Sequence, residues 1–176
     1  MGRANKRSCL LGMGALLLIA LAMWARYASR TVLHHNGWNY FRSGIYIFLF
    51  SAWGFSIRIR IVQPQVRRYL LRISALMVLW LLLRSIKFSV DNPDWERWLW
   101  YLYYVPMLLI PLLAAFVSLS LGKGENFRLP GAVKLLYVPA VLLLLLVLTN
   151  DWHYSVFSFP TGVATDGNYR YEAGYY

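Results

Sequence analysis

One uncharged stretch of 24 residues, from Trp98 to Leu121, constrains the fold of this chain more than any other feature. A bilayer has a hydrocarbon core about 30 Å thick, which a helix of about 20 apolar residues can cross. The whole chain of 176 residues is 59% hydrophobic and only 14% charged, whereas soluble domains carry about 25% charged residues. This composition excludes a disordered chain and is untypical of a cytosolic enzyme. The sequence therefore predicts an integral membrane protein.

Other apolar runs predict further spans, and with them an all-α fold, a bundle of about five transmembrane helices. The predicted spans are approximately 9–25, 43–62, 69–88, 98–121 and 132–149. The uninterrupted uncharged runs within the second and third spans are short. These segments therefore cross the membrane only if cations such as Arg58 and Arg60 extend their charged ends to the interface. The first run contains Ala20-Leu21-Ala22, the small-x-small form of a signal-peptide cleavage site, so its removal stays open as an alternative.

The basic residues predict how these spans are oriented. The chain has 18 Lys and Arg against 7 Asp and Glu, a formal net charge of +11. With five spans and a cytoplasmic N-terminus, 11 cations fall in cytoplasmic stretches and 7 outside. Because Lys and Arg are retained on the cytoplasmic side, we expect a multi-pass protein of the cell membrane with its N-terminus inside. The cations stand in short clusters between apolar runs, a pattern that favours the lipid bilayer as partner over nucleic acid.

The sequence lacks the residue patterns of enzymes and metal sites. It has no His-Glu-x-x-His zinc site, no Gly-x-Ser-x-Gly nucleophile elbow and no P-loop. The single cysteine, Cys9, excludes an intramolecular disulfide, and His34 and His35 are typical of a polar loop beyond the first span. We therefore expect no catalytic residue, no metal and no cofactor.

Charged residues near the outer end of the third span are candidates for function. Arg84 and Lys87 are three residues apart and share one helix face. Ionisable groups at membrane depth often serve function, so the two could line an anion site or pair with Asp91 or Asp94. The alternative is that both extend to the interface. With Glu96, these two acids flank Asn92-Pro93 and predict a turn and helix N-terminus before the fourth span.

Prolines interrupt the fourth and fifth spans. Pro106 and Pro111 lie in the fourth and Pro139 in the fifth. Because proline removes a backbone hydrogen bond and kinks a helix, all three are candidate hinges. Curvature for packing is the equally open alternative.

The chain becomes polar and aromatic after the fifth span. Phe157 and Phe159 share a face of an extended segment, as do Tyr169 and Tyr171, with Asp166-Gly167 as a turn signal. This pattern predicts a short extracellular β-ribbon within residues 150–176, a segment that we expect to be incomplete.

The last half of the chain resembles a known family. A proline-containing helix precedes a helix that ends in a Leu-Thr-Asn-x-x-His-x-x-x-Phe pattern, here formed by Leu148, Thr149, Asn150, His153 and Phe157. These features resemble the N-terminal seven-helix membrane sensor region of bacterial histidine kinases. In that family the pattern follows about four helices, so the fifth helix counted here would be an addition at the N-terminus.

The resemblance implies a sensory input module of a two-component system, here a fragment that lacks the later helices, the phospho-acceptor histidine motif and the ATP-binding domain. It implies a small extracellular ligand as stimulus, with a homodimer as a possible assembly, and makes Asn150, Asp151 and His153 candidate stimulus-binding residues beside Arg84 and Lys87. Capping and interface hydrogen bonds are the alternative roles of the first three. A small transporter or channel subunit with a cationic lining at Arg84 and Lys87 is the alternative function.

Overall fold

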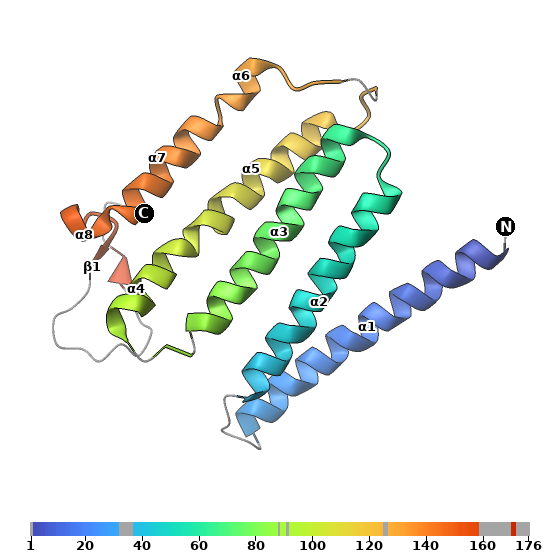
Figure 1. Ribbon diagram of the computed structural model, residues 1–176, viewed down its shortest axis with the longest axis horizontal. Coiled ribbons are helices and arrows are strands. Elements are labelled where there is room, and N and C mark those ends of the chain that lie inside the picture. The colour runs from blue at the N-terminus through green and yellow to red at the C-terminus, as the bar shows by residue number, and fades with distance from the viewer. Residues whose placement is uncertain are drawn as a thin grey trace.

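The computed structural model of the protein is α-helical, as predicted. It describes residues 2–31, 37–87, 89–90, 92–124, 127–158 and 170–171. Figure 1 shows its helices, which are α1 (Gly2–Thr31), α2 (Gly37–Arg60), α3 (Pro64–Lys87), α4 (Pro93–Leu102), α5 (Tyr104–Ser120), α6 (Gly131–Lys134), α7 (Tyr137–Leu148) and α8 (Asn150–His153). Two strands of two residues each, β1 (Phe157–Ser158) and β2 (Arg170–Tyr171), complete the described elements.

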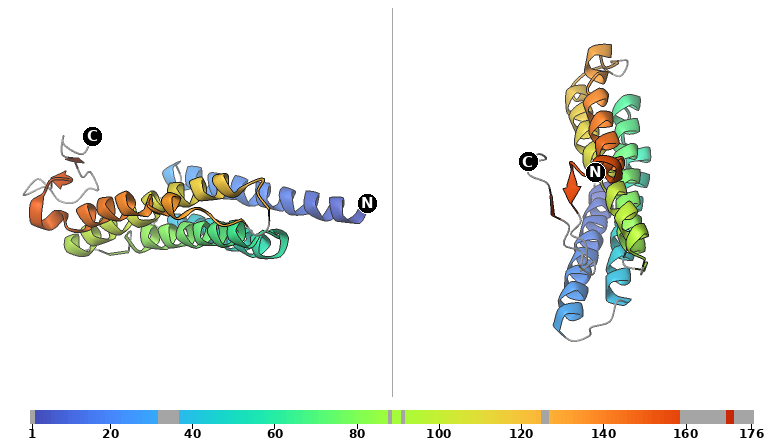
Figure 2. Two further views of the ribbon diagram at one scale, coloured as in Figure 1. Left: turned by 90° about the horizontal axis from the view of Figure 1, so that it is seen from above. Right: turned by 90° about the vertical axis from the view of Figure 1, so that its left-hand side faces the viewer.

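The long helices lie in an open row that follows the order of the chain. α1 packs against α2, α2 against α3, α3 against α5 and α5 against α7, so α1 and α7 form the two edges of the row (Figures 1 and 2). Large apolar side chains cover these edges; Leu17 on α1 is 69% exposed and Leu142 on α7 is 60% exposed. Such faces suit a lipid environment, because soluble proteins rarely expose contiguous apolar surfaces of this kind.

Three stretches of helix are long and apolar enough to cross a membrane. They are Pro64–Lys87, Asp94–Ser120 and Gly131–Leu148, while the apolar part of α1, Gly12–Ala25, is shorter. The helices also extend beyond the predicted spans at several ends: α1 begins at Gly2 rather than at residue 9, and α3 begins at Pro64 rather than at 69. A helix satisfies its own backbone hydrogen bonds, so it need not stop where its apolar face stops.

The predicted spans 98–121 and 132–149 are not single regular helices. Regular helix is interrupted at Tyr103, between α4 and α5, and at residues 135–136, between α6 and α7. The carbonyl that would pair with a proline N–H belongs to Leu102, just before the first interruption, for Pro106 and to Leu135, within the second interruption, for Pro139. Pro111, in contrast, stays inside α5 without a break in the helix.

The start of α4 follows the predicted capping chemistry. The side chain of Asn92 accepts a hydrogen bond from the backbone N–H of Asp94 at 2.9 Å, and Pro93 occupies the first turn. The helix therefore begins five residues before the predicted span, because its polar first turn is capped and helical. Asp91, like His34 and His35, lies outside the described residues.

A small residue permits α2 and α3 to approach closely. A Cβ atom added at Gly54 of α2 would lie 2.5 Å from Oγ of Ser74, and that hydroxyl donates to the Phe50 carbonyl at 2.8 Å. Small residues and cross-helix hydroxyl bonds are typical of membrane helix contacts.

After α7 the chain turns back over the helix ends. Tyr154 ends α8 in the left-handed conformation with φ of 48°. Phe157 then pairs with Tyr171 and Ser158 with Arg170 in antiparallel register. Most of the predicted ribbon, including Phe159 and Tyr169, lies outside the described residues, and residues 150–153 are helical instead of ribbon. A pair of this length does not establish a β-ribbon.

Candidate functional site

Asn150, the first residue of α8, is the centre of a buried polar cluster. Its side chain is fully buried. Its Nδ2 donates to the Tyr101 hydroxyl and to the Phe157 carbonyl, both at 3.2 Å. Its Oδ1 accepts from the backbone N–H groups of Val156 and Phe157, both at 3.0 Å. All four hydrogen-bonding positions of the amide are therefore used, and they tie α4, α8 and the segment after α8 together.

Asp151 connects α8 to α4 through a charged group. The Tyr101 hydroxyl donates to Oδ1 of Asp151 at 2.6 Å, and Nε of Arg97 lies 3.4 Å from the same oxygen. Arg97 also contacts Asp94 at 3.2 Å within α4. Hydrogen bonds to an ionised carboxylate are stronger than neutral ones, so this contact holds the position of Tyr101 firmly.

His153 faces a different set of partners. Its Nδ1 accepts from the Ser155 backbone N–H at 3.1 Å and also contacts the Ser155 hydroxyl. Because Nδ1 accepts, we assign the proton of the neutral ring to Nε2, which lies 3.3 Å from Oγ1 of Thr149. The imidazole is exposed, and its hydrogen bonds within the described part of the chain go to Thr149 and Ser155 and not to Asn150 or Asp151. The three predicted stimulus-binding residues therefore form two adjacent groups.

A layer of apolar side chains packs against the polar cluster. Buried side chains of α4, α5, α7 and the segment after α8 form this layer: Tyr101, Tyr104, Val147, Val156 and Phe157. The Phe157 ring stacks on Tyr101 with centroids 5.9 Å apart and meets Tyr104 at 5.4 Å. The conformation after α8 is thus fixed both by hydrogen bonds and by burial of a large ring.

The predicted pair on α3 has separate surroundings. Lys87 lies 3.2 Å from Glu96 of α4, with the two side chains only 11% and 16% exposed. Its ammonium also lies 4.9 Å from the centroid of the Trp100 ring. Within the described part of the chain Lys87 therefore pairs with Glu96, on the face of α4 that meets α3, while the predicted partner Asp91 lies outside the described residues. Arg84 is exposed on α3.

α4 thus presents two adjacent faces to two neighbours. Glu96 and Trp100 are four residues apart and meet α3, while Arg97 and Tyr101, also four apart, meet α8. α4 therefore connects α3 to α8 through these side-chain contacts. Among the described residues no three His, Cys, Asp or Glu are grouped to hold an ion.

Comparison with known protein families identifies the family of this chain. The family model for the N-terminal 7TM region of histidine kinases matches residues 40–175. The chain belongs to this family. No curated protein and no solved structure matches it significantly. The resemblance predicted from the sequence is thereby confirmed. The family is the N-terminal membrane sensor region of histidine kinases, and this region is not itself catalytic.

The family match and the geometry coincide at the end of α7. The match includes α8 and the segment after it and begins after α1, so α1 is outside the matched region. Within the Leu-Thr-Asn-x-x-His-x-x-x-Phe pattern, Asn150 and Phe157 contact each other, and Thr149 contacts His153. The pattern that carries the resemblance is therefore one packed structural unit.

Sequence reasoning missed the α4 half of this site. Arg97, Trp100 and Tyr101 are not among the site residues predicted from the sequence. Two pairs on α4 have the four-residue spacing of a shared helix face, Glu96 with Trp100 and Arg97 with Tyr101. Tyr101 and its partner Asp151 are 50 positions apart in the sequence, and nothing in a single sequence connects the two.

Proposed function

We propose that this chain is the membrane-embedded sensory input module of a bacterial signal-transduction protein of the histidine kinase type. The family match over residues 40–175 carries the proposal. The apolar helices support it, because they place the module in a bilayer. A stimulus at the α8 end acts by shifting the packing of α8 and α4, and the long helices carry that shift across the membrane.

The module spans the membrane five times with its N-terminus inside. Two observations support this topology. α1 and α2 have 30 and 24 residues, and a helix of 24 residues is about 36 Å long, enough to cross the hydrocarbon core. The distribution of Lys and Arg, 11 against 7, favours the same orientation. The α8 end then lies outside the cell, and the opposite end lies in the cytoplasm.

Within the α8 end, the residues divide into an anchor and a receptive face. Asn150 has no free hydrogen-bonding position, so its role is to hold the segment after α8. Asp151 and the exposed His153 are the groups that a small polar ligand can reach and bind. Any ligand that competes with Tyr101 for Asp151 loosens the link between α8 and α4, and this competition is the signalling event that we propose.

The experiment that tests the proposal measures signalling output. Membranes that carry the complete gene product, with ATP, are assayed for phosphohistidine in the wild type and in Tyr101→Phe. A bias of about 1 kcal/mol changes a two-state population by about fivefold, so we expect a change of that size in the basal phosphohistidine level. Ser118→Ala, an exposed change on α5, serves as control. The absence of phosphohistidine in the gene product would refute the proposal.

The alternative of a transporter with a cationic lining finds no supporting observation in the described part of the chain. Lys87 is held between Glu96 and Trp100 and does not line a route. Anion flux through reconstituted protein that Arg84→Ala abolishes would be the result that revives it.

A further inference from the structure

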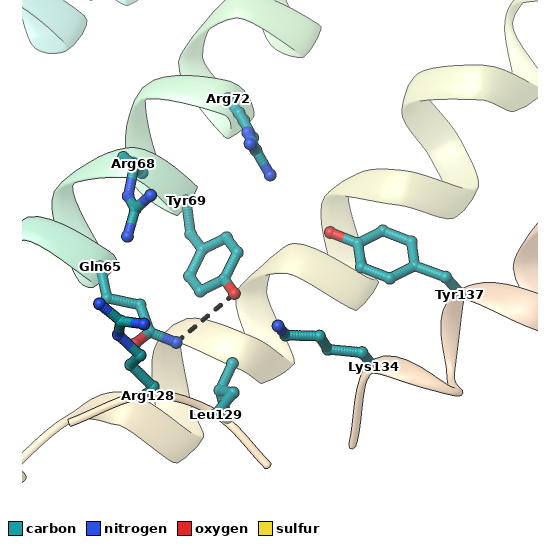
Figure 3. Close-up of a pocket in the computed structure, with 8 residues that line it drawn as sticks. All are labelled: Gln65, Arg68, Tyr69, Arg72, Arg128, Leu129, Lys134 and Tyr137. Carbon is teal, nitrogen blue, oxygen red and sulfur yellow. Dashed lines mark hydrogen bonds between the residues drawn. The ribbon is translucent and has the colours of Figure 1, made fainter. Parts of the chain in front are cut away.

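The end of the molecule opposite α8 contains a cavity with a strongly cationic lining. Its volume is about 470 Å³, and its lining comes from the start of α3, the segment before α6, α6 itself and the start of α7 (Figure 3). The lining residues are Gln65, Arg68, Tyr69, Arg72, Arg128, Leu129, Lys134 and Tyr137. Four of these eight carry a positive charge and none carries a negative charge.

The four cations have no acidic partner in the described part of the chain. Described ion pairs use the acids Asp94, Glu96 and Asp151, all at the α8 end. Glu125 is the one acidic residue in the sequence between Arg97 and Asn150, and it lies outside the described residues. Several like charges around one concave site repel each other and focus a positive potential in it. An anion from outside the chain relieves that repulsion.

The cavity is built by side chains at helical spacing on α3. Gln65, Arg68 and Arg72 follow each other by three and four residues and therefore share one face. Figure 3 shows Arg68 and Arg72 on this face, with Lys134 and Tyr137 across from them. The two lining tyrosines, Tyr69 and Tyr137, both pack against the buried Phe116, with ring centroids 5.7 Å and 5.2 Å from it.

Gln65 holds the segment before α6 in place. Its Nε2 as drawn is 3.5 Å from the Tyr69 hydroxyl (Figure 3). The reversed amide orientation satisfies both polar atoms, with the nitrogen donating to the Phe127 carbonyl and the oxygen accepting from the Leu129 N–H at 3.1 Å, and we assign that orientation. The backbone of the segment that carries Arg128 is thereby tied to α3, which keeps Arg128 on the same side of the cavity as Arg68.

An apolar groove of about 390 Å³ adjoins the cavity and shares Arg72 and Tyr137 with it. Its other lining residues are Ala75, Leu76, Leu79, Leu109 and Leu113. From Arg72 to Leu79 the groove follows α3 for about 10 Å at the rise of an α-helix. A ligand that fills both spaces has an anionic head and an apolar tail that extends toward the membrane interior.

We propose that this composite site binds one anionic phospholipid, with its phosphate in the cationic cavity and an acyl chain in the apolar groove. Arg side chains pair with phosphate oxygens through two parallel hydrogen bonds, which makes them suited to this head group. Basic pockets between membrane helices bind anionic lipids in this manner. A soluble phosphate would use the cavity and leave the groove empty. The inference needs only a membrane protein and does not depend on the signalling role.

Binding is tested on the full chain in neutral detergent by native mass spectrometry. The probes are dioleoyl phosphatidylglycerol, dioleoyl phosphatidylcholine and glycerol phosphate, which is the head group alone. We expect phosphatidylglycerol to bind at least about tenfold more tightly than phosphatidylcholine, and Arg68→Gln/Arg128→Gln to weaken it by about tenfold or more. The matched control, Arg58→Gln/Arg60→Gln, removes the same charge from exposed positions of α2 that do not line the cavity. It should change affinity by less than about threefold.

A second pair of variants tests the tail. Ala75→Trp fills the groove and should weaken phosphatidylglycerol while leaving glycerol phosphate unaffected; Ala115→Trp, on an exposed position of α5 outside the groove, should do neither. Equal loss in both charge variants would mean diffuse attraction and overturn the site. Glycerol phosphate that binds as tightly as the lipid, or Ala75→Trp without effect, would identify a soluble anion and overturn the lipid assignment.

Discussion

The two ends of the helix row differ in whether their charged side chains have partners of opposite charge. At the α8 end every acidic residue that the structure describes has a basic partner, in the pairs Lys87–Glu96, Arg97–Asp94 and Arg97–Asp151. At the α6 end, Arg68, Arg72, Arg128 and Lys134 surround one cavity without an acid among the described residues. The α8 end therefore supplies its own counter-ions, whereas the α6 end depends on its surroundings for them.

The difference extends to stability. Asn150 and Tyr101 are fully buried and bonded to each other, so removal of one leaves a hydrogen-bonding position of the other without its partner. The four cations of the cavity are exposed, and water or lipid solvates them when a neighbour is lost. Substitutions at the α8 end should therefore cost folding free energy, while substitutions at the α6 end should cost binding.

The largest effect is expected for Asn150→Ala. It removes four hydrogen bonds and leaves buried N–H groups of Val156 and Phe157 without partners, so we expect the free energy of unfolding in detergent to fall by about 3 kcal/mol or more. Asn92→Ala is the matched control, because that exposed residue also accepts from two backbone N–H groups and should cost about 1 kcal/mol. Unfolding followed by Trp fluorescence measures both. Equal losses would contradict the buried anchor.

The ion pair between α3 and α4 should show a smaller but characteristic effect. Glu96→Gln removes the carboxylate beside the largely buried Lys87 and should cost about 2 kcal/mol of unfolding free energy. The double variant Lys87→Gln/Glu96→Gln removes both charges and should recover most of that loss. The same unfolding measurement tests this coupling. If the loss of unfolding free energy in the double variant equals the sum of the losses in the two single variants, the pair is not coupled.

Two tyrosines two positions apart provide the next comparison. Tyr101→Phe removes a hydroxyl that donates to Asp151 and accepts from Asn150, which should cost about 1.5 kcal/mol. The Tyr103 hydroxyl is buried and has no hydrogen-bond partner among the described residues. Tyr103→Phe should therefore be neutral or slightly stabilising, within about 0.5 kcal/mol. Identical melting curves for the two variants would remove the distinction between bonded and unbonded hydroxyls.

The smallest effect is expected at the α6 end. In neutral detergent without lipid, Arg68→Gln/Arg128→Gln should change the unfolding free energy by less than about 0.5 kcal/mol, because both side chains are exposed and unpaired within the described chain. Thermal unfolding measures the change. A loss close to that of Asn150→Ala would mean that these cations stabilise the fold through contacts within the protein.

The sequence predicted the features that depend on local composition. Apolar runs indicated helices because hydrophobicity over about 20 residues is a local property, and the residues from Leu148 to Phe157 indicated the family. The three prolines differ: Pro106 and Pro139 each lie within four residues after a break in regular helix, whereas Pro111 lies inside α5 without one. Whether a proline interrupts a helix depends on the packing of its neighbours, which a single sequence does not contain.

Features that join distant segments were beyond prediction. Tyr101 and Asn150 are 49 positions apart, and the cavity combines α3 with residues from 128 to 137. Retention on the cytoplasmic side accounts for the basic cluster from Arg58 to Arg72 without a ligand, although such a cluster would also attract anionic lipid. The spacing of Gln65, Arg68 and Arg72 on one helix face was the available signal, but the wall that completes the cavity comes from a segment folded against it.

The account rests on the two ends lying on opposite sides of a membrane, and reporter fusions test this directly. Green fluorescent protein and alkaline phosphatase are fused in parallel after Gln63, Val90, Gly124 and Ser155, positions in the connections at the two ends. The account predicts fluorescence after Gln63 and Gly124, and phosphatase activity after Val90 and Ser155. Reporters after Gly124 and Ser155 that are active on the same side would contradict it, because α6 and α7 would then not cross the bilayer.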